Sequence, residues 1–263
     1  NGHHIPEEDL PGFDRNTQGY IKVNMINLQA AIQSPKASGV EIRLDTFREE
    51  IMWKARDSNR WETFSDHHYL DLRAQLERTG FAPVPADAAR EIVHWRANNN
   101  TFDTAQAWLE NLEWDGVPRI ETFWIDHFGV IDDMPSYARA VGLYTWTALT
   151  GRVLVPGVQA DMAPILTGSQ GLGKSRGVKA MAPLEEFATT MSFHDPEVER
   201  ARKMRGTLVV ELAELQGLKS RDREEILAWM TRDTEHWTPK FKEMSRKYGR
   251  RFVMFATTND EDF

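Results

Sequence analysis

The segment ILTGSQGLGKSRG, residues 165–177, constrains the fold of this chain more than any other part of the sequence. It matches the pattern G-x-x-x-x-G-K-[ST] at every fixed position: Gly168, Gly173, Lys174 and Ser175. A short apolar run precedes this segment and a helix-compatible sequence follows it, which is the setting that the pattern requires. A glycine-rich turn that arose by chance is the alternative, and the setting makes it the weaker one. We therefore predict a phosphate-binding loop between a strand and a helix.

The chemistry expected of such a loop is specific. Its glycines allow successive backbone N–H groups to face the β- and γ-phosphates of a nucleotide, and the following helix adds the positive end of its dipole. Lys174 is expected to contact the phosphate oxygens, and the Ser175 hydroxyl to bind Mg²⁺. We predict ATP and Mg²⁺ as cofactors. The predicted nucleotide-binding residues are Gly168, Ser169, Gln170, Gly171, Leu172, Gly173, Lys174 and Ser175. Because proline is disfavoured in a central strand, Pro164 limits the expected strand to residues 165–167.

Two glutamates follow a second apolar run, in the segment TLVVELAEL. A buried strand places its last side chains at the carboxyl edge of a parallel sheet, where ligands bind in open α/β folds. We assign Glu211 to the Mg²⁺ site and Glu214 to the attacking water, and the reverse assignment stays open. An amphipathic helix with two glutamates three residues apart is the alternative.

A third apolar run, RFVMFATTN, ends at Asn259. At the tip of a strand this side chain would hydrogen-bond the γ-phosphate or the attacking water. A simple turn in TTND is an equal alternative. Together with Lys174, Glu211 and Glu214, Asn259 completes the predicted catalytic set.

A basic segment lies just before this run. The net charge of −8 argues against a protein that coats nucleic acid with its whole surface, but residues 240–251 carry six basic side chains and one acid. The predicted DNA-binding residues are Lys240, Lys242, Arg246 and Lys247, interleaved with aromatic residues that can stack on bases. A solvated surface is the alternative. Arg250 and Arg251 either reach a phosphate bound to a neighbouring subunit or pair with acids in the sheet.

The pattern of the chain predicts two domains. Residues 1–112 read as a smaller, mostly helical α+β domain, with a hairpin or two short strands in residues 40–55 and a helix that follows Asp66 and stops at Gly80. Residues 113–263 begin with two helical patterns, and after Pro156 and Gly157 short apolar runs alternate with helices, which predicts an α/β domain with a parallel sheet. There we expect Asp195 to cap a helix whose first residue is Pro196.

Cysteine is absent, which excludes disulfides, thiolate zinc sites and cysteine nucleophiles and fits a reducing compartment. No stretch approaches 18 consecutive apolar residues and no secretory signal is visible, so we expect a cytoplasmic protein without a membrane span. The chain begins at Asn1 and stops soon after the third apolar run, which is typical of a fragment of a longer protein.

Taken together, these motifs resemble the virulence-associated protein E (VapE) family, which is encoded by phages and mobile elements and is close to the superfamily 3 helicases. The resemblance rests on the segments WDGVPRI, VPGVQAD, LVVELAEL and RRFVMFATTN, in that order around the glycine-rich loop. It implies an AAA+-like P-loop NTPase core, in which Glu211 and Glu214 form Walker B and Asn259 is the sensor. It also implies a homo-oligomeric, hexameric ring on single-stranded DNA, with an arginine finger after the sensor strand.

The leading interpretation is an ATP-driven DNA helicase or translocase acting in the replication of a phage or mobile element. A nucleotide-dependent regulatory switch is the alternative from another class. A small-molecule kinase is a weaker third, because no lid or acceptor pocket is recognisable. Within WDGVPRI we expect structural roles, with Trp114 a packed indole and Asp115 a turn carboxylate.

Overall fold

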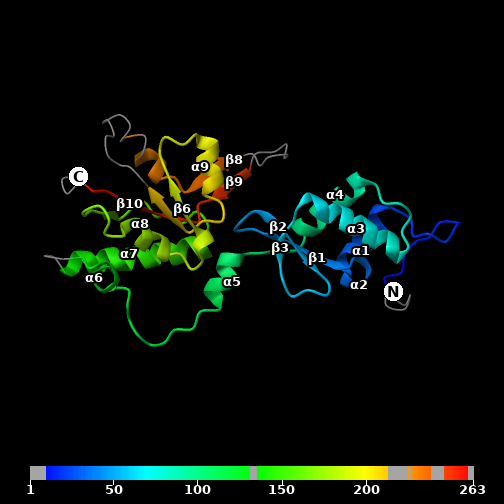
Figure 1. Cartoon of the computed structure of the whole chain (residues 1–263), viewed down its shortest axis with the longest axis horizontal. Helices are drawn as coiled ribbons and strands as arrows, with labels where there is room; N and C mark the ends of the chain where they lie inside the picture. Colours follow the sequence, from blue (N-terminus) through cyan, green and yellow to red (C-terminus); the bar gives the residue numbers. More distant parts are fainter. Residues whose placement is uncertain (1–9, 131–134, 213–223, 225–226, 238–245, 260–263) are drawn as a thin grey trace. The chain divides into compact units, whose positions relative to one another are not determined.

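The structure is a computed structural model that describes residues 10–130, 135–212, 224, 227–237 and 246–259 (Figure 1). The chain divides into two compact units, Asn1–Thr104 and Ala105–Phe263. The division falls at the start of helix α5 (Thr104–Glu110), a little before the boundary predicted after residue 112. None of the described helices is both long and apolar enough to cross a membrane.

The first unit is a four-stranded sheet packed against helices. Its elements are α1 (Met25–Gln33), α2 (Pro35–Ser38), β1 (Val40–Asp45), β2 (Glu50–Ala55), β3 (Glu62–Thr63), α3 (Asp66–Thr79), α4 (Ala86–Asn98) and β4 (Thr101–Phe102). The sheet has the order β3-β2-β1-β4, with β1 and β2 antiparallel and Val40 opposite Ala55, so the prediction of two short strands is confirmed. Helix α3 ends where Gly80 adopts a φ of 110°, as its position predicted.

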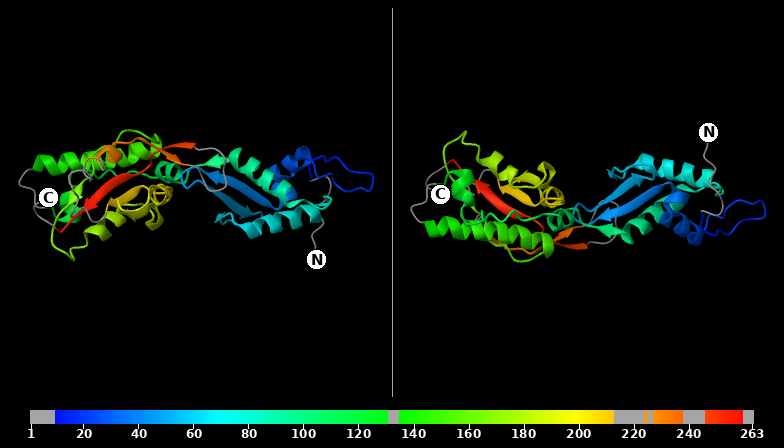
Figure 2. Two further views of the ribbon diagram at one scale, coloured as in Figure 1. Left: turned by 90° about the horizontal axis from the view of Figure 1, so that it is seen from above. Right: turned by 90° about the horizontal axis from the view of Figure 1, so that it is seen from below.

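The second unit carries every candidate site residue. Its elements are α5, α6 (Phe123–Phe128), α7 (Pro135–Leu154), β5 (Ile165–Leu166), α8 (Lys174–Ala180), a 3₁₀ turn (Glu185–Phe187), β6 (Ala188–Met191), α9 (Glu197–Lys203), β7 (Val209–Leu212), β8 (Thr234–Trp237), β9 (Arg246–Gly249) and β10 (Val253–Thr257). Strands β5, β10, β7 and β6 form a parallel sheet in that order, while β8 and β9 form a separate antiparallel pair. Figure 2 shows α7 on one side of the parallel sheet and α8 on the other.

Burial explains why the two central strands are apolar. All four residues of β7 are buried, as are the first four of β10, because helices cover both faces of a parallel sheet. Val210 and Leu212 of β7 belong to a core cluster that also includes Phe252. Strand β5 is at the edge of the described sheet, which is where a strand that follows Pro164 is tolerated.

One predicted boundary is wrong by a residue. Helix α9 begins at Glu197, and Pro196 rather than Asp195 occupies the capping position. The Asp195 carboxylate instead accepts a hydrogen bond from the Ser192 backbone N–H at 3.1 Å and pairs with Lys203 at 2.9 Å. These two partners lower the pKa of Asp195, with the Lys203 hydrogen bond the larger cause.

Candidate functional site

The glycine-rich loop connects the end of β5 to the start of α8, so the expected strand–loop–helix arrangement is present. Gly171 and Gly173 have φ values of 90° and 82°, a region that residues with a side chain rarely adopt. A Cβ atom at either position would meet nothing within 4 Å. Backbone conformation, rather than lack of space, therefore requires glycine at both positions.

Lys174 links the loop to the end of another strand. Its Nζ donates to the carbonyl oxygens of Gly168 at 2.6 Å and Ser169 at 3.0 Å. It also donates to Oδ1 of Asn259 at 3.0 Å. Two residues that the sequence separates by 85 positions are thus in direct contact, and the ammonium group is held at the centre of the loop.

Glu211 lies on β7 between threonines of the two neighbouring strands. The Thr257 hydroxyl of β10 donates to Glu211 Oε1 at 2.9 Å, and the Thr190 hydroxyl of β6 donates to Oε2 at 3.2 Å. The register produces this arrangement, because Thr190 is directly opposite Glu211 and Thr257 is two residues beyond its opposite residue, on the same face. Glu211 is only 3% exposed, so both hydrogen bonds help to keep its carboxylate in place.

These groups surround one cavity of about 660 Å³. Its lining comes from the loop, from α8 and from the carboxyl ends of β6, β7 and β10, where ligands bind in parallel sheets. The lining residues are Gln170, Gly171, Gly173, Lys174, Ser175, Arg176, Lys179, Thr190, Glu211, Thr257, Thr258 and Asn259. The structure therefore brings together seven predicted site residues: Gln170, Gly171, Gly173, Lys174, Ser175, Glu211 and Asn259.

The oxygen donors of this cavity suit a small hard cation. The Ser175 hydroxyl and the Glu211 carboxylate line it together, and Mg²⁺ is commonly held by one or two protein oxygens plus phosphate and water. Among the described residues there is no cluster of three or more histidine, cysteine, aspartate or glutamate side chains that could hold a metal ion by itself. The residues present thus fit a metal ion that arrives with a phosphate ligand.

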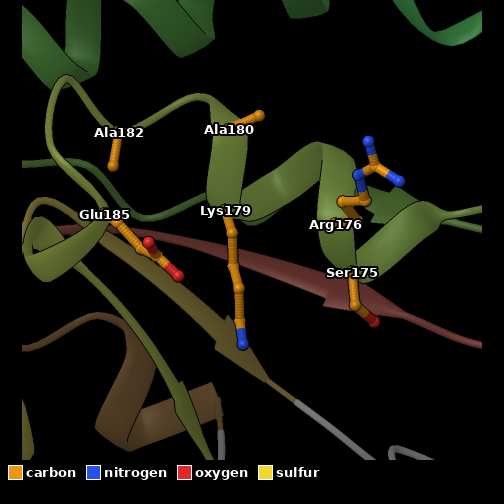
Figure 3. Close-up of a pocket in the computed structure, with 6 residues that line it drawn as sticks. All are labelled: Ser175, Arg176, Lys179, Ala180, Ala182 and Glu185. Atoms are coloured by element: carbon orange, nitrogen blue, oxygen red, sulfur yellow. The ribbon is translucent and has the colours of Figure 1, made fainter.

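Sequence reasoning missed two cationic residues, Arg176 and Lys179, and three threonines of the site, Thr190, Thr257 and Thr258. Arg176 and Lys179 line the same cavity and also an adjoining hollow of about 500 Å³, which Ser175, Ala180, Ala182 and Glu185 complete (Figure 3). In Figure 3 the Lys179 side chain runs in the same direction as that of Ser175, while the Arg176 guanidinium projects the opposite way. The one-turn spacing from Ser175 to Lys179 was the available signal. No sequence pattern pointed to Thr190 and Thr257, because their contact with Glu211 depends on the strand register.

Several predicted residues cannot be added to the site. Glu214, Lys240 and Lys242 lie outside the described residues. Arg246 and Lys247 belong to β9, where the Lys247 side chain is exposed.

The two arginines before β10 have different surroundings. Arg250 is 2% exposed, it pairs with Glu235, and its guanidinium lies 4.4 Å from the centre of the Trp229 ring. Burial lowers the pKa of Arg250, and the Glu235 carboxylate opposes that shift. Arg251 donates to the Val153 carbonyl at 3.0 Å. For Arg250, pairing with an acid is the alternative that the structure contains.

In the WDGVPRI segment one expectation is wrong and one is confirmed. Trp114 is 78% exposed, so its indole is not packed in a core. Asp115 is a turn carboxylate, because its Oδ1 accepts from the Val117 backbone N–H at 3.0 Å and both oxygens accept from Arg119, at 2.9 and 2.7 Å. The Arg119 hydrogen bond, followed by that of Val117, lowers the pKa of Asp115 to about 2.

Solved structures with a related fold were found for this chain. The apo structure of the NrS-1 C-terminal region (305–718) matches with a TM-score of 0.50 and 14% identity over 90% of this chain. This chain covers 58% of that one, so it spans somewhat more than half of its length. The A form of the apo NrS-1 C-terminal region has a TM-score of 0.47 and 15% identity, with 87% of this chain and 56% of that chain covered. A search of curated proteins found no match.

The family comparison covers most of the second unit. Residues 109–263 match the model of the virulence-associated protein E-like domain. The match includes the glycine-rich loop, Glu211, Asn259 and the exposed turn at Asp115. With more than half of its length matched, the chain belongs to the virulence-associated protein E-like domain family.

Proposed function

We propose that this chain is a P-loop ATPase that binds ATP and Mg²⁺ in the cavity between the glycine-rich loop and the ends of β7 and β10. The observation that carries the proposal is the cluster of Lys174, Glu211 and Asn259 around one cavity of about 660 Å³. A lysine from the loop, a carboxylate on one strand and an amide on the next are the parts that phosphoryl transfer uses.

Each residue of the proposed site has a distinct role in ATP binding and hydrolysis. Lys174 places a positive charge on the phosphate oxygens, which replace the carbonyl and amide oxygens that it contacts here. Ser175 and Glu211 hold Mg²⁺, and each Glu211 oxygen has a second lone pair free for the ion or its water after accepting from a threonine. When bound, Mg²⁺ neutralises charge that develops on the phosphates. Asn259 orients the γ-phosphate or the attacking water, and Glu214 polarises that water.

We further propose that ATP hydrolysis drives a helicase or translocase on single-stranded DNA during replication of a phage or mobile element. In this proposal the DNA-contacting residues are Lys240, Lys242, Arg246 and Lys247, of which Lys247 on β9 is exposed. A cytoplasmic, ring-shaped homo-oligomer, hexameric in the full-length protein, is part of the same proposal.

A nucleotide-dependent regulatory switch is the second candidate. The burial of Arg250 favours it, because an arginine held by Glu235 does not supply a trans-acting charge to a neighbouring nucleotide. An arginine finger contributes about 10³–10⁵ in rate, so an Arg250 that stays paired with Glu235 leaves that acceleration to another residue.

The test measures ATP binding by titration calorimetry and turnover by phosphate release, with and without single-stranded DNA. A Lys174→Ala variant should lose both binding and turnover. Lys22→Ala, an exposed lysine of the other unit, serves as the matched control and should change neither. DNA should stimulate turnover, and its affinity should fall as salt rises.

Each part of the proposal has its own contradicting result. ATP affinity that survives Lys174→Ala would contradict the nucleotide site. Binding of ATP with turnover that DNA leaves unchanged, together with an ATP-dependent change of oligomeric state, would favour the switch over the helicase.

A further inference from the structure

A second cavity lies beside the strand that leads into the glycine-rich loop. Its volume is about 550 Å³, within the range of small-molecule sites, and its walls come from α6, α7 and the segment that ends in β5. The larger side chains that line it are aromatic or apolar: Trp124, Tyr137, Tyr144, Met162, Ile165 and Leu166. Leu166 lines this cavity and lies only two positions before Gly168, so the cavity and the loop share one strand.

Helix α6 contacts both the sheet and the helix that follows the loop. The Trp124 ring lies 6.2 Å from that of Phe255 on β10. The Phe128 ring packs against Gly177 of α8. A Cβ atom added at Gly177 would lie 2.7 Å from Cε1 of Phe128. Glycine at 177 therefore lets α6 approach α8 closely, so α6 contacts both the wall of this cavity and the helix that begins at Lys174.

Trp124 has an unused donor in this cavity wall. Its side chain is 3% exposed, and its Nε1–H has no hydrogen-bond partner among the described residues. Buried donors without partners are rare in folded proteins because they have lost water and gained nothing. Indole Nε1 only donates, so the missing partner is an acceptor.

The two tyrosines of the cavity differ in hydrogen bonding and exposure. The Tyr144 hydroxyl donates to the Met162 carbonyl at 2.8 Å and accepts from the Met162 backbone N–H at 2.9 Å, so it fixes the wall. Tyr137 is 65% exposed, so its ring can receive a planar ligand. The cavity thus combines a wall fixed by Tyr144, the exposed ring of Tyr137 and the unpaired N–H of Trp124.

We propose that this cavity binds the purine base of the nucleotide whose phosphates occupy the glycine-rich loop, an inference that rests on the proposed ATP site. A purine has flat faces that stack on a ring such as that of Tyr137, and ring nitrogens that accept a hydrogen bond from Trp124 Nε1–H. The apolar residues Met162, Ile165 and Leu166 exclude water from the base. The base thereby contributes affinity that the phosphate contacts alone do not give.

The experiment compares ATP with inorganic tripolyphosphate, each with Mg²⁺, by titration calorimetry. The wild-type chain should bind ATP about tenfold or more tightly than tripolyphosphate. Trp124→Phe keeps the ring and removes the N–H, and it should weaken ATP about 3–10-fold, the usual value of one hydrogen bond. Tyr137→Ala should weaken ATP to a similar extent. Both variants should bind tripolyphosphate as the wild type does.

Tyr20→Ala is the matched control, since Tyr20 is 52% exposed in the other unit. Because Tyr137 is exposed, its variant keeps the test valid if Trp124→Phe does not fold. Equal wild-type affinity for ATP and tripolyphosphate, with no effect of Tyr137→Ala on either, would overturn the base site and leave the phosphate site standing. Failure of the wild type to bind either ligand would overturn both proposals.

Discussion

The hydrogen bonds that hold Glu211 give a prediction that can be worked from the structure. Thr257→Val replaces a hydroxyl by a methyl group of similar shape and removes the 2.9 Å hydrogen bond to Oε1. A hydrogen bond to a charged group contributes about 1.5–3 kcal/mol. For a unit of this size, each kcal/mol moves the melting temperature by about 2–4 °C. We therefore expect the melting temperature of the second unit to fall by about 3–12 °C.

The assay is differential scanning calorimetry, because two units can unfold in separate transitions and only one should move. Thr189→Val is the matched control. It makes the same chemical change on β6, one residue before Thr190, at a hydroxyl without a hydrogen bond among the described residues. It should change the melting temperature by no more than about 2 °C, in keeping with a substitution away from any network.

Repeating Thr257→Val in a Glu211→Ala background isolates the pair. With the carboxylate removed, the threonine substitution should have little further effect, since the interaction energy of two contacting residues appears as non-additivity. The reasoning is refuted if Thr257→Val lowers the melting temperature no more than Thr189→Val, or by the same amount with and without Glu211.

Three other predictions follow from features of the second unit. Gly171→Ala places a side chain at a φ of 90°, which costs about 1–2 kcal/mol and should lower ATP affinity about 5–30-fold in titration calorimetry; unchanged affinity would contradict the strained loop. Arg119→Ala should raise the pKa of Asp115 from about 2 toward 3.8, as followed by NMR titration. Because that pKa is lowered in the folded chain, the ion pair stabilises the fold above about pH 4 and this contribution is lost as the pH falls through about 2. Arg250→Met leaves Glu235, whose side chain is 14% exposed, without its partner and should cost about 3 kcal/mol in chemical denaturation, and a variant as stable as the wild type would refute this.

The sequence predicted the strands and helices of the site because their signals are local. A buried parallel strand reads as an apolar run, as in TLVVEL and RFVMFAT, and a glycine-rich loop followed by GKS marks the turn into a helix. The proximity of Lys174 and Asn259 is also in keeping with such signals, because the loop that leads to Lys174 follows β5 and Asn259 follows β10, at the same edge of the sheet.

What the sequence did not predict depends on register and packing. Thr190 and Thr257 contact Glu211 only because the three strands align as they do, and no local pattern fixes that alignment. The environment of Trp114 was also mispredicted, because tryptophan is highly buried on average whereas this side chain is 78% exposed. For Arg250, charge alone left two outcomes equal, and burial beside Trp229 and Glu235 decided between them.

The shortness of β5 has a consequence for motion. The strand has two residues and, in the described sheet, pairs only with β10, where Ala256 and Thr258 donate to the carbonyls of Pro164 and Leu166 at 2.9 and 3.0 Å. Regions with few such bonds open at a lower free energy than the whole fold, so amides at the entrance of the loop should exchange with solvent sooner than those of β7 and β10. Local opening would then admit and release a ligand without unfolding the sheet.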